Sequence, residues 1–211
     1  MKPYQAYFFD FDGTLFDTYE SLTYVYHYAF EQIGYDCTRE QVAVFMHMSL
    51  EETLNRLKIF DPLKRQKVLR GVQESIDFPE NIARIVIYDD VVPALKALHD
   101  AGKTTAIVSG NNEKHIALVL EQFHLTQEFA FVVGYSSKRQ PKPSGDPIFE
   151  AKKHLPSLSS ADLVYIGDSL QDPLTAKNGG IAGILLERNH EYPDYPETKI
   201  STLAVLEPSL G

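Results

Sequence analysis

The chain has 211 residues, and its shares of hydrophobic (44%) and charged (23%) residues are those of an ordinary globular protein. A net charge of −9 argues against nucleic acid and anionic membranes as partners, because their phosphates would be repelled. The single cysteine, Cys37, excludes an internal disulfide and a thiolate zinc site, and such sparing use is expected in the reducing cytoplasm.

The first predicted element is a strand over residues 4–10, with no apolar leader segment before it. Residues 17–83 then carry only helical patterns, among them two capping boxes at 38–41 and 49–52. One interpretation is that these helices pack on a face of the sheet. More than sixty residues is long for a crossover between neighbouring strands, however, so a separate helical cap domain is favoured.

From residue 84 the pattern changes, because short runs rich in Val, Ile, Phe and Tyr alternate with helical segments. Strands are predicted at 104–109, 129–135, 163–167 and 181–186, and helices at 90–102, 112–123, 147–155 and 171–178. This alternation is typical of right-handed βαβ units around a parallel sheet. The expected fold is therefore α/β: a doubly wound, Rossmann-like parallel sheet core of residues 1–16 and 84–211, with an inserted all-helical cap of residues 17–83.

Four polar segments each follow a predicted strand. In an open α/β sheet ligands bind outside the carboxyl ends of the strands, so segments distant in sequence can converge there. The first segment contains Asp10 and Asp12, two carboxylates that point to one side if the extended chain persists. Their repulsion is relieved if a cation such as Mg²⁺ bridges them or if one of them is protonated. The alternative is an ordinary strand-to-turn junction, in which Asp and Gly are common.

The second segment, Ser109-Gly110-Asn111, joins a strand to a helix. Free backbone N–H groups and the helix dipole favour an anion there, and Ser109 adds a hydroxyl donor. The third segment holds Lys142 between two prolines, which restrict the chain so that the ammonium can be aimed. Without a ligand, the same features describe a helix N-cap at Asn111 or Asn112 and a lysine on a surface turn.

The fourth segment places Asp168 at the end of a strand and Asp172 at the start of a helix. Asp168 would complete a metal site with the first segment, and Asp172 would orient the waters of the metal. Capping of the helix N-terminus explains the same residues without a metal.

Taken in order, the four segments resemble the motif signature of the haloacid dehalogenase superfamily: D-x-D-G-T, strand-Ser-Gly-Asn, Lys-Pro and G-D-S-x-x-D. The resemblance covers essentially the whole chain. It is greatest to the phosphoglycolate-phosphatase branch, whose helical cap lies between the first two motifs. It implies a phosphoric monoester hydrolase that acts on a small phosphorylated metabolite.

The resemblance also assigns roles to the acidic residues. Asp10 matches the nucleophile, which forms an aspartyl-phosphate, and Asp12 matches the general acid and base. The dehalogenases of the superfamily lack the second aspartate, so its presence favours phosphate ester chemistry. Mg²⁺ would be bound by the Asp10 carboxylate, the Asp12 backbone carbonyl and Asp168, with Asp172 supporting from a second shell.

The remaining motif positions match the phosphate-binding part of the family. Ser109 and Lys142 would bind the transferring phosphoryl group as catalytic residues, and Gly110 and Asn111 would add contacts to the substrate. One departure follows Lys142: the chain continues with Ser144-Gly145, where relatives often have a further proline.

Two other functions use similar residues. A phosphomutase of the β-phosphoglucomutase type would keep the same site but pass the phosphoryl group to a sugar hydroxyl. A receiver-type signalling domain also forms an aspartyl-phosphate, but it is shorter and has no helical insertion after its first strand. Cap side chains are candidates both for helix packing and for substrate contact: Tyr19, Tyr24, Tyr26, Tyr28 and Arg56.

Overall fold

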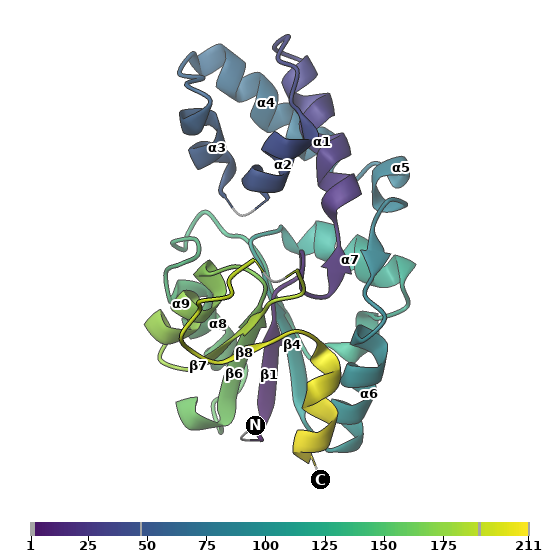
Figure 1. Ribbon diagram of the computed structural model, residues 1–211, viewed down its shortest axis with the longest axis vertical. Helices are drawn as coiled ribbons and strands as arrows, with labels where there is room; N and C mark the ends of the chain where they lie inside the picture. The colour runs from purple at the N-terminus through teal and green to yellow at the C-terminus, as the bar shows by residue number, and fades with distance from the viewer. Residues whose placement is uncertain (1–2, 47, 190, 211) are drawn as a thin grey trace. The chain divides into compact units, whose positions relative to one another are not determined.

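The structure is a computed structural model that describes residues 3–46, 48–189 and 191–210. Within these residues the larger sheet has six parallel strands in the order β5-β4-β1-β6-β7-β8 (Figure 1). Along the chain these strands are β1 (Ala6–Phe9), β4 (Thr104–Val108), β5 (Val132–Val133), β6 (Leu163–Gly167), β7 (Ala182–Leu186) and β8 (Lys199–Ile200). The order places β1 between β4 and β6, in the middle of the sheet.

Helices cover both faces of this sheet. On one face, α8 (Asp146–Lys153) and α9 (Gln171–Asn178) bury Ile148 and Ala176 against Phe8 and Tyr165 of the strands. On the other face, α6 (Val91–Asp100) packs against the C-terminal 3-10 helix η3 (Leu203–Leu210) (Figure 1). The connections are completed by α7 (Glu113–Gln122), η1 (Thr126–Glu128) and η2 (Ser160–Asp162). The arrangement is therefore doubly wound.

The carboxyl ends of the central strands lie at one edge of the sheet. In the parallel register Phe9 is opposite Ile107 of β4 and Ile166 of β6. Asp10 directly follows Phe9, and Asp168 follows the end of β6. The register alone therefore brings these two acidic residues to the same edge.

Contacts divide the chain into two compact units, Met1–Phe16 with Ile87–Gly211, and Asp17–Val86. The second unit contains α1 (Tyr19–Glu31), α2 (Arg39–Phe45), α3 (Leu50–Arg56), α4 (Pro62–Ser75) and α5 (Pro79–Ile82). It ends at Val86, whereas the sequence placed the end of the cap at Ala83. The boundary between the units falls within β3 (Val86–Ile87), which pairs with β2 (Phe16–Asp17).

Local sequence signals account for the helices of the second unit. The capping boxes predicted at 38–41 and 49–52 are confirmed, with reciprocal hydrogen bonds at the start of α2 and α3. Tyr26 is buried in the core of this unit beside Phe30 and Phe45. Tyr19 instead carries the Arg39 guanidinium over its ring, 5.3 Å from the centroid. Of these candidate cap tyrosines, Tyr26 is therefore buried in the core of the unit and Tyr19 is only partly buried.

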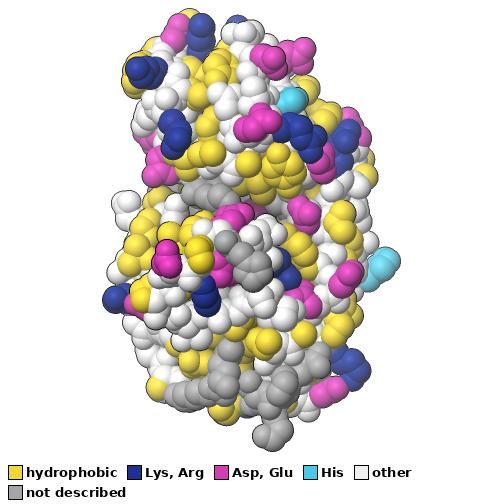
Figure 2. All heavy atoms as spheres, viewed as in Figure 1, with side chains coloured by type: hydrophobic (Ala, Val, Ile, Leu, Met, Phe, Trp, Pro, Cys, Tyr) yellow, Lys and Arg dark blue, Asp and Glu magenta, His cyan; other side chains and the backbone are white. Residues whose placement is uncertain are grey.

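The predicted fold class is confirmed as a parallel α/β sheet with an all-helical insertion. The strand predicted at 129–135 is reduced to Val132–Val133, at a sheet edge where only one neighbour supplies hydrogen bonds. The short β8 was not predicted. No helix of the described residues has the length and apolarity that a membrane span requires. On the face shown in Figure 2, acidic and basic side chains are interspersed with hydrophobic ones.

Candidate functional site

Asp10 lies at the end of the central strand β1. Its backbone N–H donates to the carbonyl oxygen of Ile166 at 2.9 Å, which ties the end of β1 to β6. The side chain is buried, and its Oδ1 lies 3.0 Å from Nζ of Lys142. Burial raises the pKa of the Asp10 carboxyl to about 7, against the opposing effect of Lys142, and Asp172 adds to the rise. Such a perturbed carboxyl is typical of functional sites.

Three carboxyl groups gather at this edge of the sheet. Asp10, Asp168 and Asp172 each offer an oxygen, and these oxygens lie within 4.8 Å of one another. Asp172 is fully buried and accepts hydrogen bonds from the backbone N–H and the hydroxyl of Ser169, both at 2.9 Å. Asp168 accepts one from Thr14 Oγ1 at 3.1 Å. Burial raises the pKa of Asp168 well above its usual range, and the charges of Asp172 and Asp10 raise it further.

Lys142 is the cation of this cluster. Its Nζ lies 2.7 Å from Asp172 Oδ1 and 3.0 Å from Asp10 Oδ1, and it donates to the Tyr165 hydroxyl at 3.2 Å. These three partners match the three N–H bonds of an ammonium group. Burial acts to lower the pKa of Lys142, but the two carboxylates outweigh burial and raise the pKa well above its usual value. The surface-lysine interpretation is therefore wrong for this residue.

The loop that carries Lys142 is anchored to both neighbouring helices. The Ser144 hydroxyl donates to Oδ1 of Asp146, the first residue of α8, at 3.1 Å. Asn178, at the end of α9, donates its side-chain amide to the carbonyl oxygen of Pro143 at 2.8 Å. A Cβ atom on Gly145 would lie 2.5 Å from the Asn178 carbonyl oxygen, so the close approach requires glycine. The departure from the family pattern after Lys142 thus supplies the anchors of its loop.

Two glycines make room for two of the acidic side chains. Gly13 has a φ of +69°, and a Cβ atom there would lie 2.2 Å from Asp168 Oδ2. A Cβ atom on Gly167 would lie 2.2 Å from Asp172 Cγ. Any larger residue would displace the carboxylates, so these glycines are requirements of the cluster.

The second polar segment reaches Asp12, beside the cluster. Asn111 donates its side-chain amide to Asp12 Oδ2 at 2.7 Å, and its backbone N–H donates to Ser109 Oγ at 3.2 Å. The N-cap of α7 is Asn112, whose side chain accepts from the backbone N–H of His115 at 2.8 Å. The helix-cap interpretation therefore holds for Asn112, whereas the side chain of Asn111 binds Asp12.

The predicted residues come together in two adjoining groups. Asp10, Lys142, Asp168 and Asp172 form the cluster, in which Lys142 contacts Asp10 and Asp172 and the three carboxylates lie close together. Asp12, Asn111 and Ser109 form a chain of hydrogen bonds next to Asp10, with exposed Gly110 between the last two. The N-cap of α9 is Leu170, so neither Asp168 nor Asp172 serves as the helix cap.

Sequence reasoning missed three side chains of this site. Thr14 contacts Asp168, Ser169 contacts Asp172, and Tyr165 contacts both Asp172 and Lys142. Thr14 and Ser169 belong to the D-x-D-G-T and G-D-S-x-x-D motifs, in which the sequence indicated roles for the aspartates only. Tyr165 belongs to a strand whose apolar pattern gave no sign that one hydroxyl would point to the cluster.

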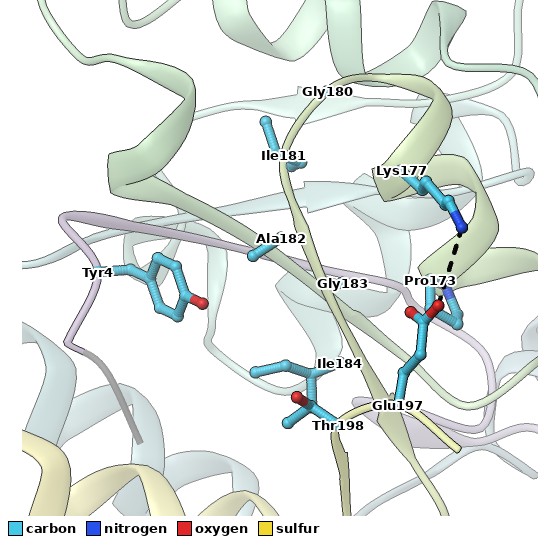
Figure 3. A pocket seen from close by; sticks show the side chains of 10 residues that line it. All are labelled: Tyr4, Pro173, Lys177, Gly180, Ile181, Ala182, Gly183, Ile184, Glu197 and Thr198. Atoms are coloured by element: carbon cyan, nitrogen blue, oxygen red, sulfur yellow. Dashed lines mark ion pairs between the residues drawn. The ribbon is translucent and has the colours of Figure 1, made fainter. Parts of the chain in front are cut away.

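A separate hollow of about 600 Å³ lies away from these residues, at the start of β7 (Figure 3). Tyr4, Gly183 and Thr198 are among its lining residues, and Lys177 and Glu197 face each other there at 3.8 Å. None of the predicted site residues lines it. This hollow is therefore separate from the predicted site residues.

The acidic cluster fits a divalent cation. Carboxylate oxygens are the ligands that Mg²⁺ prefers, and two of the three carboxyl groups contact the one ammonium group, so the cluster carries an excess of negative charge when all three are ionised. The raised pKa values of Asp10 and Asp168 have the repulsion between neighbouring carboxylates among their causes. A bound cation would relieve that repulsion.

Comparison with known proteins identifies the family of this chain. The profile of the haloacid dehalogenase-like hydrolase family matches residues 7–186. The chain is 28% identical to a phosphoglycolate phosphatase of Vibrio parahaemolyticus, over 88% of this chain and 85% of that protein. It is also 28% identical to a provisionally named pyrophosphatase, PpaX, of Caldanaerobacter subterraneus, over 90% of this chain and 88% of that protein.

Solved structures share the fold. A crystal structure from Bacteroides fragilis, described provisionally as a haloacid dehalogenase-like hydrolase, superposes with a TM-score of 0.86 at 25% identity. The match covers 96% of this chain and 99% of that one. A predicted phosphatase from Clostridium acetobutylicum also has a TM-score of 0.86, at 20% identity over 99% of both chains.

Proposed function

This chain belongs to the haloacid dehalogenase-like hydrolase family, and on that premise we propose that it hydrolyses a small phosphate monoester through an aspartyl-phosphate on Asp10, with Mg²⁺ as cofactor. The phosphoglycolate phosphatases among its relatives support a phosphoric monoester hydrolase. The observation that carries the proposed mechanism is the Asp10 carboxyl group, held at the end of β1 beside Lys142 and two further carboxyl groups.

In the first step an Asp10 carboxylate oxygen forms a bond to phosphorus while the ester P–O bond breaks. Lys142 and the segment beginning at Ser109 bind the non-bridging oxygens of the phosphoryl group. Because Lys142 keeps its positive charge, it offsets the charge that a phosphoryl group brings to the acidic cluster. The contacts of Lys142 with Asp172 and Tyr165 hold it in place, while the N–H that it directs to Asp10 would turn to the phosphoryl group as Asp10 attacks.

Asp12 is proposed as the proton carrier. In the first step it gives a proton to the leaving alkoxide. In the second step it takes a proton from the attacking water, whose oxygen bonds to phosphorus while the bond between Asp10 and phosphorus breaks. Asn111 holds Asp12 Oδ2, which leaves Oδ1 to carry the proton. Such general acid–base assistance is worth about 10²–10⁴ in rate.

Asp10, Asp168 and the Asp12 backbone carbonyl are the proposed ligands of Mg²⁺, with Asp172 behind them. When bound, the ion would neutralise the carboxylates and stabilise the charge on the transferring phosphoryl group. The cluster supports this assignment through its oxygen ligands and its unbalanced negative charge.

Hydrolysis of p-nitrophenyl phosphate with and without Mg²⁺ tests the proposal. We expect turnover with Mg²⁺, loss of turnover with EDTA, and no turnover for Asp10→Asn. A panel of small phosphate monoesters that begins with phosphoglycolate would then identify the substrate. Full activity of Asp10→Asn, or of the metal-free protein, would contradict the mechanism.

A further inference from the structure

Arg188 follows β7 at the carboxyl edge of the sheet, and only 13% of its side chain is exposed. Its Nη1 lies 2.9 Å from Asp90 Oδ2, and its Nη2 donates to Asp90 Oδ1 at 3.0 Å, so the ion pair has two parallel hydrogen bonds. The same Nη2 also donates to the carbonyl oxygen of Thr14 at 2.8 Å. One guanidinium thus joins the start of α6 to the turn after β1.

The pair is held from several sides. The Arg188 guanidinium lies over the ring of Tyr88, with Cζ 3.9 Å from the ring centroid. Asp90 Oδ2 also accepts from Thr202 Oγ1 at 2.6 Å and from the backbone N–H of Leu203 at 2.8 Å. Each oxygen of Asp90 therefore has a donor, which favours one geometry for this partly buried ion pair.

Thr14 connects this pair to the acidic cluster. Its carbonyl oxygen accepts from Arg188, and its hydroxyl donates to Asp168 Oδ1. Thr14 is fully buried, so neither group is exposed to solvent. Because both groups belong to one residue, a partner that fixes the Thr14 peptide also limits where the hydroxyl can point.

We propose that Arg188 and Asp90 are positioning residues for the metal site, which hold Thr14 so that its hydroxyl stays on Asp168. The inference rests on the proposed function, because Asp168 is one of the carboxylates assigned to Mg²⁺. Under a competing explanation, the pair only ties η3 to α6 and stabilises the fold. The two explanations differ in whether loss of the pair changes the affinity of the folded protein for the metal.

Isothermal titration calorimetry with Mg²⁺ alone on the full chain distinguishes them without reference to catalysis. The natural sequence, Arg188→Met, Thr14→Val and the double variant form a double-mutant cycle. Partners behind a metal ligand are worth about 10- to 100-fold in metal affinity, so Thr14→Val is expected to weaken binding about tenfold. We expect Arg188→Met to weaken it between about threefold and tenfold. The double variant is expected to bind as Thr14→Val does, because both changes act through one hydrogen bond.

Two further variants serve as controls. Lys199→Met removes an ion pair with Glu187 at the same end of β7, 3.1 Å in length, and is expected to leave the Mg²⁺ affinity unchanged. Arg188→Lys keeps the charge opposite Asp90 but lacks the planar fork that pairs with both Asp90 oxygens while it donates to Thr14, so it should bind as Arg188→Met does. It replaces the methionine variant if circular dichroism shows that the latter is unfolded.

Natural Mg²⁺ affinity in the Arg188 variants, with weakened binding in Thr14→Val, would overturn the positioning role. The positioning role would also be overturned if the losses of Mg²⁺ affinity in the two single variants multiplied in the double variant. An equal loss of Mg²⁺ affinity in Lys199→Met would overturn it too, because either result indicates a general loosening of the fold. If the natural chain binds no Mg²⁺, the proposed metal site fails and this inference with it, which is a separate and recognisable result.

Discussion

The Tyr165 hydroxyl accepts a hydrogen bond from the Lys142 ammonium at 3.2 Å, deep in the core of the sheet. The same hydroxyl lies 2.8 Å from the carbonyl oxygen of Val108 and 3.1 Å from Asp172 Oδ1, either of which can accept its single proton. Burial, with the charges of Asp10 and Asp172, raises the pKa of Tyr165 well above its usual value, so the hydroxyl stays neutral. A neutral hydroxyl therefore completes the surroundings of the partly buried lysine.

Tyr165→Phe is expected to lower both stability and activity. Removal of the hydroxyl leaves Lys142 with one donor unpaired in a partly buried site, at a cost of up to about 1–3 kcal/mol in the free energy of unfolding. Tyr7→Phe is a matched control, because Tyr7 is equally buried and its hydroxyl accepts from the backbone N–H of Tyr4. Urea unfolding should show losses in both variants, whereas kcat should fall only in Tyr165→Phe. A normal kcat in that variant would limit Tyr165 to packing.

Lys142→Ala is expected to lower kcat/KM by about 10- to 150-fold, the equivalent of one charge-assisted hydrogen bond to the transferring phosphoryl group. Lys142→Arg should recover little of this loss, because a planar fork replaces a compact point charge among three close partners. Lys153→Ala is the control, since Lys153 pairs with Glu150 on the surface. Steady-state kinetics with p-nitrophenyl phosphate measures all three variants. Equal kcat/KM in the two alanine variants would remove Lys142 from the reaction.

Asp12→Asn separates the two steps of the proposed reaction. An aryl phosphate releases a stable anion and hardly needs an acid, so this variant should still phosphorylate Asp10 and release one equivalent of nitrophenol. It should then stall, because no base activates the hydrolytic water. With an alkyl phosphate, whose leaving group needs a proton, no burst is expected.

Rapid-mixing absorbance and intact-protein mass measure this outcome. The mass of Asp12→Asn should increase by one phosphoryl group after mixing with the aryl ester, and that of Asp10→Asn should not. Near-natural turnover of both ester types by Asp12→Asn would make Asp12 a structural turn residue and would contradict the mechanism.

Asp90 should make stability depend on pH in the acid range. Burial acts to raise the pKa of Asp90, but hydrogen bonds from Arg188, Thr202 and Leu203 outweigh it, and the pKa is lowered. A carboxyl whose folded pKa lies below its unfolded value stabilises the fold above the unfolded pKa, about 3.9, and loses that contribution as pH falls through the folded pKa. Asp90→Asn should therefore be less stable than the natural chain at pH 7, and the difference should shrink below about pH 4.

Urea unfolding of both proteins between neutral and acid pH measures that difference. Asp100→Asn is the control, because Asp100 pairs with Lys96 on the surface, where an ion pair contributes little. A stability difference between natural chain and Asp90→Asn that stays constant across the range would show that Asp90 acts through packing and not through its charge.

Much of the fold follows from local patterns. The alternation of apolar runs and helices predicted a doubly wound parallel sheet, and Thr38 and Ser49 marked helix starts because their capping boxes need only four consecutive residues. Strand ends were less predictable. The residues at 129–135 have strand character, but β5 forms over Val132–Val133 only, since pairing depends on a neighbour that the local sequence does not specify.

The candidate site shows the same division. Asp10 and Asp168 could be placed at one edge from the sequence, because parallel strands end together and each residue follows a strand. Lys142 was placed by its motif, although the proline-rich turn around it is equally typical of a surface. Its burial is decided by the loop anchors at Ser144, Gly145 and Asn178.

By itself the sequence determined which residue types stand at the ends of which strands, because strand and helix patterns extend over a few neighbouring residues. Only the tertiary structure decided which side chains touch. The bonds from Asn111 to Asp12 and from Arg188 to Thr14 join residues far apart in the chain. A hydrogen bond requires atoms within about 3 Å in a suitable direction. That depends on strand order, register and rotamer together, and no local pattern of residues contains this information.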